Sequence, residues 1–288
     1  MRRIAAGSLT LSLLAVLHAF PAAAVTWYVP AQAPTIAAGV DSAAAGDTVL
    51  VACGTYFERN IDVPSGICLR SESRQADGAV LDGEGLDRVL WAQSVTDMRL
   101  QGFTITGGYR NWGAGISLND SPIEIADCLF AGNTATWQGG GLLIEYCDPV
   151  LRNVTVAGNA APQGSGMYVY FAAPIIENAL VALNDGLSVW CSTQSAPQFS
   201  CSDIWGNSAG DWQACIADQL GQDGNIWADP LFCDPPADPW TLDAASPCLP
   251  ANNDCGELMG ALGQSCAVVA VPGEEPGAAG QGRMVLVK

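Results

Sequence analysis

Short runs of alternating apolar and polar residues recur along the middle of the chain. Each unit opens with a glycine before an apolar alternation, passes a proline, and closes with an asparagine after two further short apolar runs. The openings are Gly115, Gly141, Gly166 and Gly186, the prolines are Pro122, Pro149, Pro174 and Pro197, and the closing residues are Asn133, Asn159, Asn184 and Asn207. The closing asparagines are 26, 25 and 23 residues apart, so the repeat is about 25 residues long.

This repeat predicts three short strands and three turns per unit. In a strand, alternation with a period of two directs every second side chain inward. A single unit cannot bury its apolar face, whereas stacked units bury one another's faces and pair their backbones. The glycines and asparagines disfavour helix here, and no 3.6-residue period persists. An antiparallel sandwich would not require the same residue type at the same place in successive units, so the pattern favours an all-β parallel β-helix (solenoid).

The chain resembles the right-handed parallel β-helix proteins of the pectin-lyase-like superfamily. The resemblance covers residues 26–210 and rests on the glycine openings and on polar turn residues that look like that fold's stacked asparagine ladder: Asp127, Asn153 and Asn178. Residues 28–58 also resemble the opening coil of many of these proteins, which implies a short N-terminal capping helix near residues 35–44. The same scaffold carries lyases, hydrolases, esterases, adhesins and non-catalytic proteins, so the resemblance implies a fold and no single activity.

The ends of the chain differ from its middle. Arg2 and Arg3 precede an apolar stretch that leads to Ala22-Ala23-Ala24, which predicts a signal peptide over 1–24, export, and no membrane span. The β-helix is expected over 25–210. Residues 211–266 are rich in Pro and Cys and are expected to form a disulfide-rich C-terminal cap over the open end, continuous with the solenoid. Residues 267–288 are expected to be a flexible tail.

Net charge and composition limit the partners and the catalytic groups that this protein can use. The net charge of −18 argues against nucleic acid as a partner, and against acidic polymers without Ca²⁺. The single histidine, His18, lies in the predicted signal peptide, and the last residue is the only lysine. Catalysis by a histidine triad, a histidine metal site and a lysine Schiff base are therefore excluded from the mature chain. Asp218, Asp223 and Asn225 could hold Ca²⁺ through oxygen ligands, but they lack the spacing of a recognised site and are interpreted as solvated loop residues, so no cofactor is expected.

The eleven cysteines cluster toward the C-terminus, with seven between Cys191 and Cys266. In an exported protein this clustering predicts disulfides that stabilise a loop-rich region. Irregular spacing and the lack of histidine argue against zinc. From proximity alone we expect Cys233 to pair with Cys248 and Cys255 with Cys266.

The catalytic motifs of enzymes in this superfamily are incomplete in this sequence. Polygalacturonases use aspartates with a histidine that the mature chain lacks, and we find no run like the Asp, Gln and Arg motifs of pectin methylesterases. Pectate lyases use carboxylates for Ca²⁺ with an arginine base, which keeps that class open. The carboxylate and arginine candidates are Glu145, Asp120, Asp127 and Arg152. Arg152 and Glu177, one repeat apart, are more simply interpreted as a surface ion pair.

An aromatic and acidic strip is the candidate binding site. Side chains one and three positions after each inward-facing apolar residue of the first strand should face solvent, including Ser117 and Leu143. The strip comprises Trp112, Trp137, Glu145, Tyr168, Tyr170 and Trp190. Aromatic faces beside polar groups suit sugar rings, although such aromatics also cover strand edges in many folds.

The leading hypothesis is a monomeric, non-catalytic exported protein that binds polysaccharide or cell-surface glycan. The alternatives are a polysaccharide lyase or glycoside hydrolase, and an adhesin or envelope structural protein.

Overall fold

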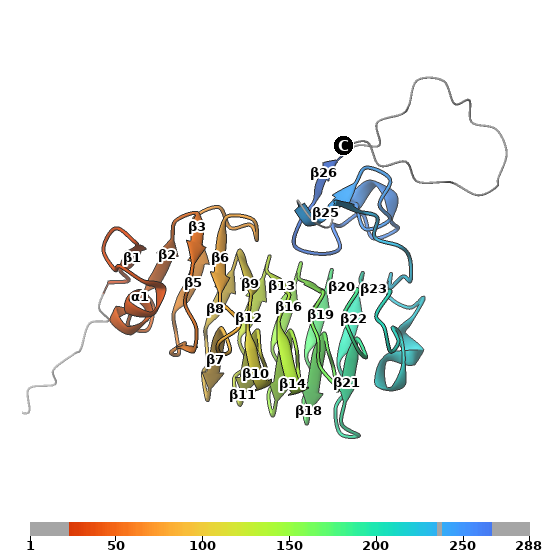
Figure 1. Cartoon of the computed structure of the whole chain (residues 1–288), viewed down its shortest axis with the longest axis horizontal. Helices are drawn as coiled ribbons and strands as arrows, with labels where there is room; N and C mark the ends of the chain where they lie inside the picture. Colours follow the sequence, from red (N-terminus) through yellow and green to blue (C-terminus); the bar gives the residue numbers. More distant parts are fainter. Residues whose placement is uncertain (1–22, 235–237, 267–288) are drawn as a thin grey trace, which may run out of the picture.

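The computed structural model describes residues 23–234 and 238–266, most of which form a parallel β-solenoid of about nine turns (Figure 1). Each regular turn contributes one strand to each of three stacked parallel sheets in this part of the chain. The predicted signal peptide, apart from its last two residues, and the predicted tail lie outside the described residues.

We name one sheet for its length and the other two for what lies on their outward faces. The long sheet contains β1 (Thr26–Val29), β2 (Thr48–Val51), β5 (Cys68–Ser71), β8 (Arg99–Gln101), β12 (Glu124–Ala126), β16 (Val150–Arg152), β19 (Ile175–Glu177) and β22 (Gln198–Ser200). The groove sheet contains β4 (Ile61–Asp62), β7 (Leu90–Gln93), β11 (Ile116–Asn119), β15 (Leu142–Glu145), β18 (Met167–Tyr170) and β21 (Val189–Cys191). The covered sheet contains β3 (Gly54–Tyr56), β6 (Ala79–Asp82), β9 (Phe103–Thr106), β13 (Leu129–Ala131), β17 (Thr155–Ala157), β20 (Leu180–Ala182) and β23 (Asp203–Trp205).

The register of these strands confirms the predicted repeat. Ile116 pairs with Leu142, and Leu142 with Met167, so equivalent apolar residues stack in rows inside the solenoid. These side chains are completely buried in one continuous core. The alternation seen in the sequence is therefore the alternation between this core and the outward face.

Asparagine amides reinforce the stack at the end of each repeat. Asn159 Oδ1 accepts hydrogen bonds from both the backbone N–H and the Nδ2 of Asn133, each at 3.0 Å, and Asn184 does the same for Asn159. Asn207 continues the row. These asparagines stabilise the stack through amide hydrogen bonds, and none of them has a left-handed backbone.

The turn residues that suggested an asparagine ladder form a second row. Asp127, Asn153 and Asn178 have left-handed backbones, with φ of 53°, 51° and 56°. Asn153 Nδ2 donates to Asp127 Oδ1 at 3.1 Å, and Asn178 Nδ2 donates to Asn153 Oδ1 at 3.0 Å. Short polar side chains tolerate this backbone and hydrogen-bond along the stack, which explains their recurrence.

A short helix, α1 (Ile36–Ser42), packs at the end of the solenoid next to β1 (Figure 1). Thr35 Oγ1 accepts the Ala38 N–H at 3.0 Å, and the Glu58 carboxylate accepts the first two helical N–H groups at 2.7 and 2.9 Å. Ile36 and Val40 face the core. The expected capping helix is therefore present within 35–44.

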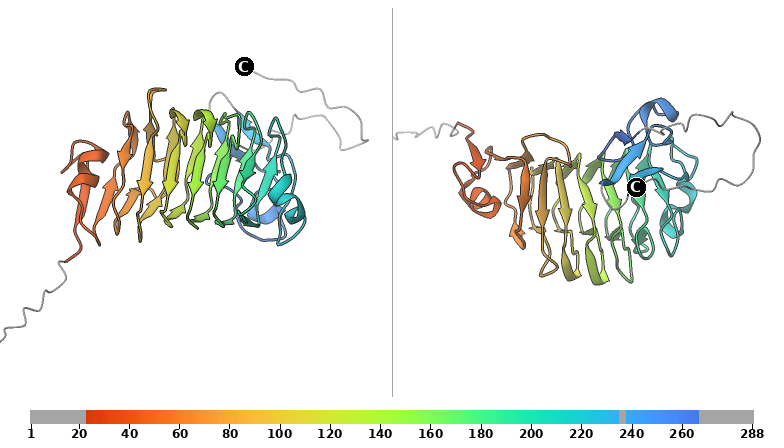
Figure 2. Two further views of the ribbon diagram at one scale, coloured as in Figure 1. Left: turned by 90° about the horizontal axis from the view of Figure 1, so that it is seen from below. Right: turned by 45° about the horizontal axis from the view of Figure 1, so that its top comes forward.

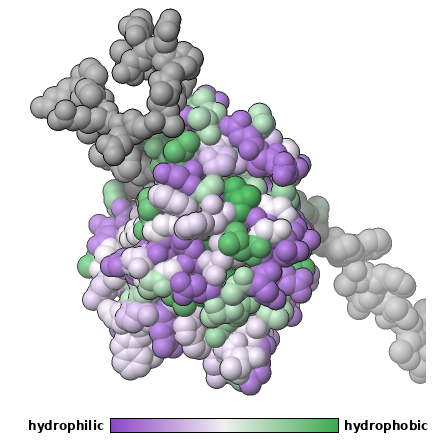
Figure 3. All heavy atoms as spheres, turned by 90° about the vertical axis from the view of Figure 1, so that its right-hand side faces the viewer, coloured by the Kyte–Doolittle hydropathy of each residue, from purple (hydrophilic) through white to green (hydrophobic). Residues whose placement is uncertain are grey.

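The C-terminal region does not lie where the sequence analysis placed it. Only its first part covers the open end, where η1 (Ala214–Gln219) buries Ile216 and Trp212 packs edge-on against Phe199. Seen from this end, hydrophobic residues are interspersed among hydrophilic ones (Figure 3). Residues 232–234 and 238–266 turn back instead and lie along the outward face of the covered sheet (Figures 1 and 2).

We call these residues the back-folded segment. It contains β24 (Phe232–Asp234), β25 (Asp238–Asp243), η2 (Pro250–Asn252) and β26 (Gln264–Cys266). The Ala261 N–H donates to Thr155 Oγ1 at 2.9 Å and the Gly260 N–H donates to the Asn178 carbonyl at 2.8 Å. The expectation of an end cap over all of 211–266 is corrected because β13 and β20 direct leucine and alanine outward, and this apolar surface is buried beneath the segment.

The predicted cysteine pairs are wrong. The disulfides among the described residues are Cys191–Cys215, Cys201–Cys255 and Cys233–Cys266, and Cys248 is a buried free thiol. Proximity along the chain misled the prediction, because stacking and back-folding set which sulfur atoms meet. The disulfides indicate an oxidising compartment. No described helix is long and apolar enough to cross a membrane.

Candidate functional site

A groove of about 390 Å³ lies on the outward face of the groove sheet. Its floor consists of outward side chains of β7, β11 and β15, and one wall comes from β10 (Tyr109–Trp112) and β14 (Thr134–Gln138), which pair as a two-stranded ribbon. The lining residues are Arg88, Trp91, Gln93, Trp112, Ser117, Asn119, Gln138, Leu143 and Glu145.

Glycine turns let the ribbon approach the sheet. Gly113 and Gly139 have left-handed backbones, with φ of 59° and 67°. A Cβ atom on Gly113 would lie 2.8 Å from the Ser117 Cβ and 2.9 Å from the Leu143 Cβ. Only glycine combines this backbone with so close an approach, so the repeat places a turn directly over the sheet.

The ribbon carries two tryptophans, of which Trp112 lines the groove and Trp137 lines an adjoining cavity with Pro162 and Gln163. Trp112 and Trp137, which are 25 residues and therefore one repeat apart, make an edge-on contact with ring centroids 5.5 Å apart. Their side chains remain 42% and 60% exposed, so much of their surface is not used in packing. Gln138 Nε2 anchors the ribbon by donating to Gln163 Oε1 at 2.8 Å and to the Tyr168 hydroxyl at 3.1 Å.

The groove floor carries both hydrogen-bond donors and acceptors. Asn119 Nδ2 donates to Glu145 Oε2 over 3.4 Å, a long contact that leaves the carboxylate with further acceptor capacity. Arg88 lies half-buried beside them. Its burial lowers the pKa of the guanidinium, nearby Arg110 lowers it further, and the charges of Asp87 and Glu145 oppose the shift. The floor therefore combines amides and a carboxylate with a guanidinium, which suits a ligand bearing many hydroxyl groups.

Part of the predicted strip is covered. Tyr168 is only 5% exposed, and its ring stacks on Trp190 with centroids 4.4 Å apart and planes 1° from parallel. Ser117 and Leu143 are also buried, although they point away from the core. The expectation that these three face solvent is corrected, because the ribbon and its glycine turns fold over this row of the sheet.

Next to Glu145, two exposed aromatic residues that the sequence did not predict, Tyr146 and Phe171, join Tyr170 of the predicted strip. Tyr146, Tyr170 and Phe171, here called the aromatic turn cluster, have ring centroids 4.6–5.6 Å apart. Tyr146 and Phe171 have left-handed backbones, with φ of 56° and 48°, yet their side chains are exposed. A left-handed conformation costs such residues about 1–2 kcal/mol each.

The position of this cluster in the repeat could have revealed it. Ser94 and Asp120 occupy the equivalent position in the two preceding turns, directly after the first strand, and they share the left-handed backbone. The fold itself favours a small polar residue there, so aromatic side chains at Tyr146 and Phe171 are an exception to the local rule. A departure of this kind indicates a role at the surface.

The four catalytic candidates do not form one cluster of contacts. Asp120 and Glu145 are neighbours in the stack, where the Asp120 N–H donates to the Glu145 carbonyl at 3.0 Å. Asp127 and Arg152 belong to the long sheet and its following turn. Arg152 Nε lies 2.7 Å from Glu177 Oε2, which confirms the predicted ion pair, and Arg152 also contacts Glu124.

Of the three candidate Ca²⁺ ligands, Asn225 stabilises the last turn of the solenoid. Asn225 is buried, accepts the Ser202 N–H at 3.1 Å and donates to the Phe199 carbonyl at 2.9 Å. Within residues 23–234 and 238–266 there is no group of three or more His, Cys, Asp or Glu side chains arranged to hold a metal ion.

Comparisons with protein-family models, curated proteins and solved structures found no match to this chain. The groove is therefore interpreted from its own geometry.

Proposed function

We propose that this chain is an exported, non-catalytic member of the right-handed, pectin-lyase-like β-helix proteins that binds carbohydrate in the groove. The observation that carries this proposal is the pair of exposed tryptophans, Trp112 and Trp137, beside a polar floor. Sugar rings place C–H faces against aromatic rings and need hydrogen-bond partners for their hydroxyl groups. The groove and the adjoining cavity, which share Gln138, offer both.

The competing interpretation is that the aromatics only complete the fold. It accounts well for Tyr168, which is almost fully buried and hydrogen-bonded. It accounts poorly for Trp137, because a side chain that is 60% exposed contributes little burial. It also leaves the exposed aromatic turn cluster unexplained.

A glycan array followed by affinity measurements tests the proposal. We expect wild-type protein to bind a carbohydrate, and Trp112→Ala and Trp137→Ala each to weaken binding about tenfold or more, because truncated aromatic anchors typically cost above 1 kcal/mol.

Trp227→Ala is the matched control. Trp227 is 61% exposed, like Trp137, but it lies off the ribbon and lines a cavity with Leu220 and Asp211 near the C-terminal end of the solenoid. This variant should bind normally. Absence of glycan binding by the wild type, or equal binding by all variants, would contradict the proposal.

A further inference from the structure

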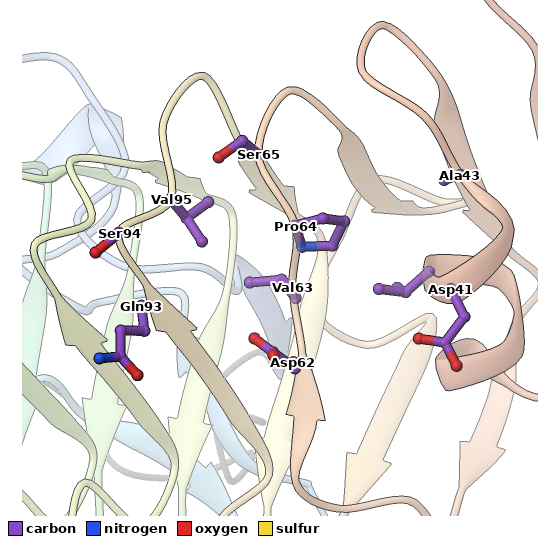
Figure 4. Close-up of a pocket in the computed structure, with 10 residues that line it drawn as sticks. Asp41, Ala43, Asp62, Val63, Pro64, Ser65, Gln93, Ser94 and Val95 are labelled. Carbon is purple, nitrogen blue, oxygen red and sulfur yellow. The ribbon is translucent and has the colours of Figure 1, made fainter.

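A second cavity, of about 400 Å³, opens beside α1 at the start of the groove sheet (Figure 4). The end of α1, the strand β4 with the turn that follows it, and the end of β7 each supply part of its lining. Its lining residues are Val40, Asp41, Ala43, Asp62, Val63, Pro64, Ser65, Gln93, Ser94 and Val95.

This cavity adjoins the groove. Gln93 lines both, and it pairs in register with Asn119, which pairs with Glu145, which pairs with Tyr170. One row of outward side chains thus leads from the second cavity through the groove to the aromatic turn cluster. Neighbouring strands lie about 4.8 Å apart, so the path from β4 to β18 is about 19 Å long.

The charges along this path restrict its ligand. The side chains of Asp41 and Asp62 make no ion pair or hydrogen bond within the described part of the chain. Burial, and secondly the charge of Asp41, raise the pKa of Asp62. Glu145 and Asp120 add negative charge further along, against the half-buried Arg88. A polymer of acidic sugars would be repelled, whereas hydroxyl groups can donate to these carboxylates.

We propose that the second cavity is a further subsite of the groove, and that the ligand is an extended, uncharged polysaccharide lying along the solenoid axis. This inference rests on the proposed function. The polysaccharide contacts Asp62 and Gln93 at one end, Trp112 and Trp137 in the middle, and the aromatic turn cluster at the other end. Several sugar units are engaged at once, each by a different turn of the solenoid.

A length series of an uncharged oligosaccharide, measured by titration calorimetry, tests the inference. For the wild type, affinity should rise with length until the path is filled. Asp62 is not part of the groove lining. Asp62→Ala should therefore leave the affinity for the shortest bound oligomer unchanged and weaken the affinity for the longest about tenfold. Asp77→Ala, at an exposed aspartate in the turn between β5 and β6, is the matched control and should match the wild type at every length.

The outcomes separate the two proposals. If no oligosaccharide binds, the proposed function fails. If Trp112→Ala and Trp137→Ala weaken binding but affinity does not depend on length or on Asp62, the subsite is overturned while the groove stands. A loss of affinity in Gln163→Ala but not in Asp62→Ala would overturn the subsite and show that the polysaccharide crosses the ribbon instead. Tighter binding of acidic oligomers than of uncharged ones would overturn the assignment of ligand charge.

Discussion

The covered sheet and the groove sheet both direct apolar side chains outward, yet the two faces differ in what lies against them. On the covered sheet these side chains are mainly leucine and alanine, and the back-folded segment buries them. On the groove sheet they include large aromatic rings among amides and carboxylates, and a groove remains open. Small aliphatic residues can stabilise the fold by close packing, whereas exposed aromatic rings beside polar groups are suited to a ligand.

The largest expected effect comes from the disulfide that holds the back-folded segment to the solenoid. Cys201 and Cys255 are 54 residues apart in the sequence. The double variant Cys201→Ser/Cys255→Ser should lower the free energy of unfolding by about 2–5 kcal/mol, because the cross-link restricts the unfolded chain. Denaturant unfolding measures the loss, and Cys53→Ser, at an exposed free thiol, is the control. An unchanged unfolding midpoint would show that the segment is held by packing alone.

Truncation of a buried leucine on the covered sheet should have the next largest effect. Leu180 is 1% exposed and packs with Leu242, Leu249 and Met259 of the back-folded segment. Leu180→Ala should lower the free energy of unfolding by roughly 3 kcal/mol, through lost apolar burial and the cavity left behind. Amide hydrogen exchange should increase in residues 238–266. Faster exchange only in β18 and β21 would contradict this prediction, because those strands belong to the groove sheet and not to the covered sheet.

A buried carboxyl group makes the contact with the back-folded segment sensitive to pH. Asp203 is fully buried, where it accepts the Ala228 N–H at 3.1 Å and contacts the thiol of Cys248 at 3.4 Å. Burial raises the pKa of Asp203 to about 7, partly opposed by these hydrogen bonds, while Asp211 and Asp229 raise it further. The folded protein therefore retains a proton that the unfolded chain releases near pH 4.

The sign of the pH effect follows from that proton. The stability contributed by protonated Asp203 is complete below about pH 4 and is lost as pH rises toward 7, at up to about 1.4 kcal/mol per pH unit. Asp203→Asn should flatten this part of the pH profile. Thermal unfolding from pH 4 to 8 measures it, with Asp77→Asn as the exposed control. Parallel profiles for wild type and Asp203→Asn would contradict the assignment.

The smallest expected effect on stability belongs to the groove wall. Trp137→Ala removes a large side chain, but one that is mostly exposed, so the free energy of unfolding should change by less than about 0.5 kcal/mol. Thermal unfolding beside Leu180→Ala gives a direct comparison of the two faces. A loss as large as that of Leu180→Ala would mean that the tryptophan wall stabilises the fold, and would weaken the case for a ligand.

Much of the solenoid was predictable because its signals are local and repeated. The spacing of Asn133, Asn159, Asn184 and Asn207 indicated the length of each turn, and Trp112 and Trp137, 25 residues apart, meet because they are separated by one such repeat. The floor of the groove was only partly predictable. Trp91 and Gln93 belong to a turn whose repeat is less regular, so their alignment with Ser117 and Asn119 appears only in the strand register.

The sequence by itself determined the parallel stack, its inward rows and its polar turns, because each turn repeats contacts made with its immediate neighbours. Only the tertiary structure decided which outward residues are covered, which sulfur atoms pair, and where the back-folded segment lies. Ala261 meets Thr155 across 106 residues of chain, and Asp203 meets Cys248 across 45. Such contacts depend on the shape and polarity of the completed surface, and no periodic pattern encodes them.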